Sequence, residues 1–311
     1  MRAPHHFHRK ELTMYVLLGS SGQITTQLAH RLLGAGHDVR IVGRNRNALT
    51  ALEKAGAQLA VGDPGDAAFL ERAFTGATAA YTMTPPCYSE PDMRAAQDRV
   101  GSAIAEALRK ARVPRVVNLS SVGAELAEGT GPIAGLHAQE QRLAGMSEVL
   151  HLRPGSFMEN YLAALHPVVA AGVLPGLETA DATVPLVATR DIAAVAAREL
   201  TQPQRNGVLI LHAPQHATPR KVAAVLGEAI GQPGMPYVQT SAEEMKAVLL
   251  AQGFSSDAAD QLEALARWLS TSPLASVSAA PVEVQPTTLE MFARDTFAPA
   301  CNAIRTPVLQ A

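Results

Sequence analysis

The sequence predicts an α/β protein built on a parallel sheet with helices on both faces. From residue 14 to residue 152, apolar strand-like runs alternate with stretches of helical periodicity, joined by short connections. Runs such as Tyr15 to Leu18 are apolar without interruption, as expected of strands covered on both faces. Glycine-rich or polar loops follow several of these runs, at the edge where parallel sheets bind ligands.

The first predicted unit is a strand, a glycine turn, a helix and a second strand. Tyr15 to Leu18 runs directly into Gly19-Ser-Ser-Gly22, and apolar residues then recur at helical spacing until Gly34. Val39 to Val42 forms the second strand. Such a turn points several backbone N–H groups and a helix dipole at one place, so it suits a pyrophosphate.

The turn departs from a full dinucleotide-binding fingerprint, because Thr25 stands where a third glycine is expected. Helix and strand are therefore expected to pack slightly further apart there. Taken alone, the turn has a second interpretation, a tight turn that only packs a helix on a sheet. Its place in a complete βαβ unit near the start of the chain favours the phosphate-binding one.

The residues after the second strand bear on the choice of dinucleotide. An acidic residue usually stands there in NAD sites, but this chain has Arg44, Asn45 and Arg46. A guanidinium group suits the 2′-phosphate of NADP. The alternative is that Arg44 and Arg46 are solvated loop charges.

The rest of the first half supplies three further strand and helix pairs. The strands are predicted at residues 58–61, 79–83 and 115–119, and the helices at residues 47–55, 69–74 and 92–112. Thr84-Pro85-Pro86 ends one strand, because proline cannot extend a ladder, and Ser120-Ser121 follows the next. The loops that follow the strands are expected to gather at one edge of the sheet.

The second half is less regular. A helix at residues 133–146 and a sixth strand at 149–152 continue the pattern, and residues 161–183 predict a short helix and loops. Further predictions are a brief edge strand at 184–187, a helix that starts near 189–191 and continues over 192–200, a strand at 207–212, amphipathic helices at 219–230, 242–253 and 256–269, an exposed loop at 270–285 and a last helix at 288–297.

Composition narrows the class of protein. The 311 residues are 47% hydrophobic and 17% charged, with a net charge of −2, so nothing indicates binding to nucleic acid or to a membrane. Cys87 and Cys301 make no metal-ligand spacing, and we expect no metal site. The absence of a signal-peptide pattern and of a membrane-spanning apolar run predicts a cytoplasmic protein. It is predicted to be a monomer or homodimer.

The first residues are polar and contain several histidines. They are predicted to be a disordered N-terminal extension of residues 1–13, either upstream of a start at Met14 or left from cloning. Metal binding by His5, His6 and His8 is the alternative.

Several separate motifs, in order, resemble the NmrA-like branch of the atypical short-chain dehydrogenases. They run from Met14 to about Phe297 and read YVLLGSSGQI, VGRNRN, GDPGD, YTMTPP, VVNLSS, LRPGSFMENY, VPLVATRDIAAVA and TTLEMFARD. The resemblance implies a Rossmann doubly wound sheet with a small, mostly helical C-terminal lobe over the nicotinamide. Residues 14–160 would then form the NAD(P)-binding core, and residues 161–311 the rest of the sheet interleaved with a substrate-pocket lobe.

The resemblance also implies a cofactor, NADP(H), and the residues around it. These are Gly19, Ser20, Ser21, Gly22, Gln23, Ile24, Arg44, Asp63, Pro64, Thr82, Met83, Thr84, Pro85, Ser120, Pro154, Gly155, Ser156 and Phe157.

The catalytic chemistry is less well specified. Typical short-chain dehydrogenases place a tyrosine four residues before a lysine on one helix, and no tyrosine in this chain has that partner. His137 is the best remaining proton donor, unless it only packs or caps its helix. Ser121 is a second candidate, unless it only caps a turn. Tyr88, Met158 and Tyr161 are candidate substrate contacts, although Met158 also suits a core position.

Two functions remain open at this stage. One is an NADPH-dependent reductase of a small conjugated acceptor such as a quinone or iminium-type compound, which accepts hydride without a strong protein acid. The other is a catalytically silent regulator that senses NADP(H). The missing Tyr–Lys pair favours the regulator, whereas the helical region from Pro219 to Leu269, able to enclose an apolar pocket, favours the reductase.

Overall fold

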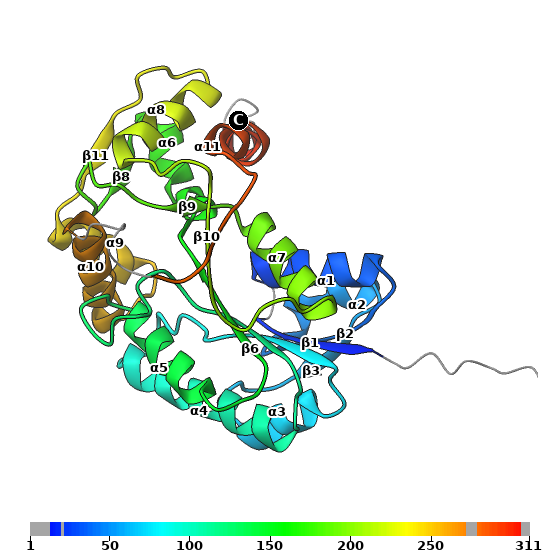
Figure 1. Ribbon diagram of the computed structural model, residues 1–311. Coiled ribbons are helices and arrows are strands. Elements are labelled where there is room, and N and C mark those ends of the chain that lie inside the picture. The colour runs from blue at the N-terminus through cyan, green and yellow to red at the C-terminus, as the bar shows by residue number, and fades with distance from the viewer. Residues whose placement is uncertain (1–12, 20–21, 272–278, 306–311) are drawn as a thin grey trace, which may run out of the picture.

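The computed structural model describes residues 13–19, 22–271 and 279–305. An eight-stranded, fully parallel sheet runs through the centre of the molecule, so the predicted α/β class is confirmed (Figure 1). No helix within the described ranges is both long and apolar enough to cross a membrane. The predictions for His5, His6, His8, Ser20 and Ser21 lie outside these ranges. Across the sheet the strands are β12 (Val282–Val284), β10 (Gly207–His212), β6 (Val149–Pro154), β5 (Val116–Leu119), β4 (Ala79–Met83), β1 (Met14–Leu18), β2 (Asp38–Gly43) and β3 (Gln58–Val61).

The strand order creates a switch point beside β1. The chain passes from β1 through β2 to β3 on one side, then returns to β4 on the other side of β1 and continues outward. The loops after β1 and β4 therefore diverge, which opens a crevice at the carboxyl edge of the sheet. Open α/β sheets bind their ligands at such a crevice.

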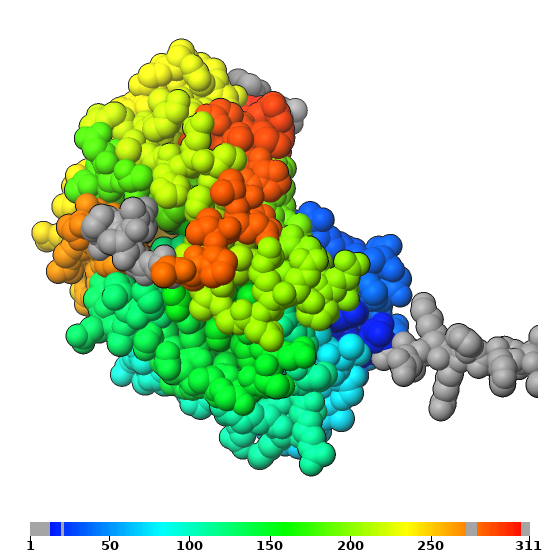
Figure 2. All heavy atoms as spheres, in the orientation of Figure 1, coloured from blue at the N-terminus to red at the C-terminus, as the bar shows by residue number. Residues whose placement is uncertain are grey.

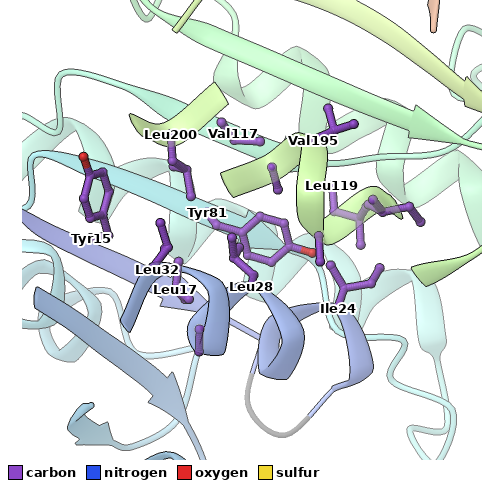
Figure 3. Packing of buried hydrophobic residues seen from close by; sticks show 14 of the residues in the cluster. Tyr15, Leu17, Ile24, Leu28, Leu32, Tyr81, Val117, Leu119, Val195 and Leu200 are labelled. Carbon is purple, nitrogen blue, oxygen red and sulfur yellow. The ribbon is translucent and has the colours of Figure 1, made fainter. Parts of the chain in front are cut away.

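One face of the sheet is covered by α1 (Gln23–Gly34), α2 (Arg46–Lys54) and α7 (Thr189–Thr201). Leu28 and Leu32, one turn apart on α1, are completely or almost completely buried against strand residues such as Leu17 (Figure 3). Burying a leucine of this kind contributes about 1.5–3 kcal/mol. The helical periodicity of the sequence thus reports the face of α1 that meets the sheet.

The other face is covered by α3 (Ala67–Phe74), α4 (Met93–Lys110) and α5 (Ile133–Leu143). Near the carboxyl ends of the strands this face carries a buried polar row in register across β4, β5 and β6. Thr82 Oγ1 donates to Asn118 Oδ1 over 3.1 Å, and Asn118 Nδ2 lies 3.2 Å from His151 Nδ1. Burial lowers the pKa of His151, so its neutral ring accepts the amide proton.

A second lobe has its own core above the sheet. Met158, Leu174, Val222, Phe292 and Phe297 belong to that core, which includes the free thiol of Cys301. The elements of this lobe are the 3₁₀-helix η1 (Met158–Ala164), α6 (Leu165–Ala171), the paired strands β8 (Leu174–Gly176) and β11 (Tyr237–Gln239), α8 (Pro219–Ala229), α11 (Leu289–Phe292), the π-turn η3 (Ala293–Phe297) and α12 (Ala298–Arg305). In Figure 2 the orange and red atoms of the C-terminal segment run along the face shown, up to this lobe.

Two helices, α9 (Ala242–Ala251) and α10 (Ser256–Thr271), lie beside the carboxyl edge of the sheet (Figure 1). Trp268 of α10 packs against Gly123, and Phe254 stacks on Tyr88 with ring centroids 4.8 Å apart. Met93 N donates to Asp257 Oδ2 over 2.8 Å, which ties the start of α10 to the start of α4. α9 was predicted to be an amphipathic helix, but none of its residues is buried.

Three sequence predictions need correction. The predicted edge strand at 184–187 is β9 (Leu186–Val187), which pairs with β7 (Ser156–Phe157) in a separate small sheet. The predicted loop at 270–285 contains β12, the edge strand of the main sheet, and α10 extends to residue 271. The last helix continues beyond 297 as α12. These strands are two or three residues long, so they depend on distant partners rather than on local periodicity.

Candidate cofactor and substrate site

The glycine turn leaves the start of α1 open to a ligand. Gly22 N donates to Gly19 O over 3.2 Å, and Gly22 caps the helix without any side-chain hydrogen bond. Among the described residues no side chain caps the first amide groups of α1, so these groups can bind an anion, with the helix dipole adding to the attraction. A cavity of about 240 Å³ lies beside this turn and is lined by Gly22, Gln23 and Ile24 together with Tyr81.

Thr25, the departure from the glycine fingerprint, is accommodated by Gly19. Thr25 is 1% exposed, and a Cβ placed on Gly19 would overlap with its Oγ1 atom. The threonine thus occupies the space that a side chain at position 19 would need. Strand and helix approach each other here through one glycine and one threonine rather than through two glycines.

Gly19→Ala is accordingly expected to destabilise the protein by about 1–3 kcal/mol, because the new methyl group meets a buried side chain that cannot move away. The double variant Gly19→Ala/Thr25→Gly removes that collision and should recover a large part of the loss. Urea unfolding of both variants measures this. A double variant no more stable than Gly19→Ala would show that Thr25 is not the obstacle.

Arg44 lies at the carboxyl edge of the sheet beside the loop that carries Asp63. It is exposed, and it has no hydrogen bond or ion pair within the described parts of the chain. Gly62 N donates to Gly43 O over 3.1 Å, so the loops after β2 and β3 are direct neighbours. The neighbouring Arg46 differs, since its Nη1 lies 2.6 Å from Glu53 Oε1.

A second guanidinium group, from Arg99 on α4, reaches the same region. Its Nη1 lies 3.6 Å from Asp63 Oδ2, and Asp63 Oδ1 accepts a hydrogen bond from Gly65 N. Burial and Glu90 raise the pKa of the Cys87 thiol, and Arg44 and Arg99 partly offset this rise. Both cations therefore act on one loop. Sequence reasoning did not find Arg99, because an exposed helical arginine carries no local signal.

A larger cavity of about 310 Å³ lies next to the first one, and the two share Met83, Leu119, Phe157 and Asn160. Its floor is formed by residues at the carboxyl ends of β5 and β6, and α5 contributes one wall. Its roof is the helix α10, through Leu262, Leu265, Trp268 and Leu269. No charged side chain lines this cavity among residues 13–19, 22–271 and 279–305. The arrangement suits an apolar, uncharged ligand.

The structure brings together many of the residues predicted from the sequence, although it does not test their roles. Those lining one or both cavities are Gly22, Gln23, Ile24, Met83, Thr84, Tyr88, Ser120, Ser121, Pro154, Gly155, Ser156 and Phe157. Those outside both linings are Gly19, Arg44, Asp63, Pro64, Thr82, Pro85, His137, Met158 and Tyr161.

His137 lies outside both cavities. Its Nδ1 is 2.8 Å from Ala124 O, so the ring bonds to the backbone of the loop after β5. This contact agrees with the alternative given for His137 from the sequence, in which the side chain only packs or caps its helix. Met158 is fully buried in the core of the second lobe, which is likewise its alternative. Proton donation by His137 and substrate contact by Met158 stay predictions that no contact in the structure supports.

The two serines after β5 line the larger cavity with their protons already engaged. Ser121 Oγ donates to Val122 O over 2.9 Å, and Ser120 Oγ donates to Glu140 Oε1 over 2.5 Å. Each hydroxyl has a single proton to donate. Toward the cavity, Ser120 and Ser121 therefore offer only acceptor lone pairs in this arrangement.

Glu140 belongs to a buried ionic network behind the cavity. Arg153 donates two hydrogen bonds to Glu140, from Nε to Oε1 at 2.9 Å and from Nη2 to Oε2 at 2.6 Å. Its Nη1 donates a third to Glu125 Oε2 at 2.8 Å. The bidentate guanidinium partner fixes the position of both carboxyl oxygens of Glu140. Burial raises the pKa of Glu125, the second carboxyl on the same cation. Glu140 in turn holds Ser120 in place through its Oε1.

Thr84 supplies a buried hydroxyl to the lining of the larger cavity. Its side chain is 5% exposed, and its Oγ1 has no hydrogen-bond partner within the described residues. A buried hydroxyl without a partner is costly, so a ligand atom or a water molecule is expected to bind it.

A parallel sheet with a switch point beside β1 and a glycine turn after that strand defines a doubly wound α/β fold of the Rossmann type. The family model described as the NmrA-like family matches residues 13–293, and the chain belongs to that family. The resemblance noted from its motifs is thereby confirmed.

Curated relatives cover most of the chain. A (4-alkanoyl-5-oxo-2,5-dihydrofuran-3-yl)methyl phosphate reductase from Streptomyces griseus subsp. griseus is 30% identical over 242 residues, which are 77% of this chain and 81% of the relative. An NAD(P)H azoreductase from Xenophilus azovorans is 27% identical over 255 residues, 81% of this chain and 86% of the relative.

Solved structures show the same fold. An NADPH-dependent quinone oxidoreductase from Escherichia coli, complexed with NADPH, matches with a TM-score of 0.72 at 23% identity over 91% of this chain and 100% of that one. A triphenylmethane reductase from Citrobacter sp., complexed with NADP(H), matches with a TM-score of 0.72 at 20% identity over 90% of this chain and 99% of that one.

Proposed function

We propose that this protein is an NADPH-dependent reductase that transfers hydride to a small, uncharged or cationic conjugated acceptor, such as a quinone or an iminium-type compound. The observation that carries the proposal is the pair of adjoining cavities. One lies at the open start of α1, and the other is apolar, roofed by α10 and free of charged side chains in its described lining. Two relatives that are named as reductases, one of them an NAD(P)H azoreductase, support it.

The residues present fit a bound dinucleotide. The open amide groups at the start of α1 would hold its pyrophosphate, and Arg44, with Arg99 beside it, would hold the 2′-phosphate. The nicotinamide would lie at the junction of the two cavities, beside Phe157 and Leu119. When bound, the cofactor supplies the hydride, and the protein supplies position and exclusion of water.

The described lining of the larger cavity contains no Asp, Glu, His, Lys or Arg side chain, which restricts the acceptor. An iminium cation is neutralised by hydride and needs no proton. A quinone that accepts hydride becomes a hydroquinone anion, which takes its proton from water after release. Thr84 Oγ1, buried and without a partner, would donate to the quinone oxygen as negative charge develops there. Thr84→Val should then slow quinone reduction more than iminium reduction, and equal slowing would refute this role.

The larger cavity predicts discrimination by charge. A neutral naphthoquinone is expected to have a kcat/KM at least about tenfold above that of its sulfonated analogue, because the sulfonate would be desolvated without a cationic partner. Residues 272–278, which lie outside the described ranges, contain no Lys, Arg or His that could pair with the sulfonate. Steady-state NADPH oxidation with both acceptors measures the ratio.

Leu265→Lys provides the matched variant for that ratio, because it adds one cation to the roof of the cavity. The ratio between the neutral and sulfonated acceptors should fall. Equal rates on both acceptors in the wild-type protein would show that this cavity does not bind the acceptor.

The alternative is an NADP(H)-sensing regulator without turnover. The lack of a Tyr–Lys pair and the engagement of both serine protons favour it, since they leave little acid–base capacity in the site. Tight NADPH binding with no oxidation by any acceptor would decide for the regulator.

We further propose a reducing compartment such as the cytoplasm, in keeping with the free thiols of Cys87 and Cys301. The monomer or homodimer prediction stays open to sedimentation analysis.

A further inference from the structure

Tyr81, in the middle of β4, has a buried hydroxyl group that the core does not use. The residue is 0% exposed, and its ring packs in the core between the sheet and α1. Its hydroxyl oxygen has no hydrogen-bond partner among the residues that the structure describes. Buried polar groups almost always have a partner, and a phenylalanine would fill the same space without this cost. The hydroxyl therefore indicates a partner that lies outside the described residues, and a bound ligand is such a partner.

The position of this hydroxyl points to the cofactor cavity. Figure 3 shows it directed along the sheet toward Ile24, in the first turn of α1. Tyr81 lines the cavity of about 240 Å³ together with Gly22, Gln23 and Ile24, the residues of the predicted pyrophosphate turn. A ligand that occupies this cavity would meet the open amides of α1 and the Tyr81 hydroxyl together.

The other polar groups of this cavity leave Tyr81 unpaired. The Glu159 carboxylate accepts hydrogen bonds from Thr189, at 3.0 Å from the backbone N and 2.6 Å from Oγ1, so it is already engaged. Burial raises the pKa of Tyr81 far above its usual range, so the phenol keeps its proton at any working pH. Tyr81 is thus a permanent donor in a cavity that suits an anionic ligand.

We propose that Tyr81 is a cofactor-binding residue, whose phenol donates a hydrogen bond to a pyrophosphate oxygen of the bound dinucleotide on its nicotinamide side. This rests on the proposed function, since it requires a dinucleotide in the site. The nicotinamide side is indicated because this cavity shares Met83 and Phe157 with the larger cavity. Arg44 follows β2, two strands from β4 and beyond β1, and Asp63 follows β3, one strand further.

The test compares Tyr81→Phe with the wild-type protein for two ligands. NADPH spans the whole cleft, whereas 2′,5′-ADP contains only the adenosine half with one phosphate on each side of its ribose. Tyr81→Phe is expected to weaken NADPH about tenfold or more, the usual effect of losing a hydrogen bond to a charged group, and to change 2′,5′-ADP less than about twofold. The melting temperature without ligand should stay equal or rise, because the unpaired hydroxyl is gone.

Tyr15→Phe is the matched control. Tyr15 belongs to the same core cluster and lies at the opposite end of it from Ile24 (Figure 3). Its loss of a hydroxyl should leave both affinities unchanged.

Three results would overturn the assignment of Tyr81. NADPH affinity equal to that of the wild-type protein would remove the proposed hydrogen bond, and equal weakening of both ligands would show general damage. A fall in the melting temperature of ligand-free Tyr81→Phe would show that the hydroxyl has a partner within the protein. If the wild-type protein binds neither NADPH nor 2′,5′-ADP, the proposed function fails, and this assignment fails with it.

Discussion

Arg44→Ala is expected to weaken NADPH about tenfold to a hundredfold and to leave NADH nearly unchanged. The two dinucleotides differ only in the 2′-phosphate, and a guanidinium group contributes about 1.5–3 kcal/mol to a charged hydrogen bond of this kind. Arg44 stands directly after β2, is exposed, and has no partner in the described chain that would compete for it. Isothermal titration with both dinucleotides measures the difference.

Arg46→Ala is the control for this experiment, because Arg46 lies in the same loop but is paired with Glu53 at 2.6 Å. It should change NADPH affinity less than twofold. Arg99→Ala is expected to give a smaller loss than Arg44→Ala, since Arg99 is shared with Asp63. If Arg44→Ala weakens NADPH and NADH equally, Arg44 is a surface charge, and the preference for NADPH has another cause or does not exist.

Glu140→Gln should lower the free energy of unfolding by about 3 kcal/mol or more. Arg153 and Glu140 are only 7% exposed, and removing one partner leaves a buried guanidinium with Glu125 as its remaining carboxylate. The volume of the side chain is conserved, so the loss reports charge rather than packing. Urea unfolding followed by circular dichroism gives the value.

The surface pair of Glu106 and Lys110 provides the comparison. Its atoms lie 2.7 Å apart, about as close as the buried pair, but both side chains are more than half exposed. Glu106→Gln should therefore leave the free energy of unfolding nearly unchanged. If Glu140→Gln lowers the free energy of unfolding no more than Glu106→Gln does, the buried network does not hold the floor of the cavity in place, and Glu140 does not fix the Ser120 hydroxyl.

Local patterns predicted the first half of the fold well. Burial can be read directly from two patterns in this half. A strand covered on both faces is apolar without interruption, as from Tyr15 to Leu18, and a helix covered on one face has apolar residues at helical spacing, as in α1. The short strands β7, β9 and β12 left no such pattern, since each is stabilised by a distant partner strand. In α9 the pattern was present without the burial, because its apolar residues Val248 and Leu250 are about half exposed.

The site was predictable where it follows from the rule that ligands gather at the carboxyl ends of parallel strands. Thr84 and Ser120 were predicted in this way, whereas Pro154 and Phe157 follow from the resemblance to the NmrA-like family, and all four line the larger cavity. The hydrogen bonds that the serine hydroxyls donate could not be predicted, because they depend on contacts such as that of Ser120 with Glu140. Tyr81 was missed for a related reason, since a strand covered on both faces predicts its burial but not the direction of its hydroxyl.

The most direct test of the account is anaerobic mixing of the protein with NADPH and a neutral naphthoquinone, followed at the absorbance band of the reduced nicotinamide. Hydride transfer in the cavity roofed by α10 predicts stoichiometric loss of that band, slowed by a primary isotope effect when the transferred hydrogen is deuterium. Tight binding of NADPH without any loss of the band, with every neutral or cationic acceptor, would contradict the account and leave a protein that only senses the dinucleotide.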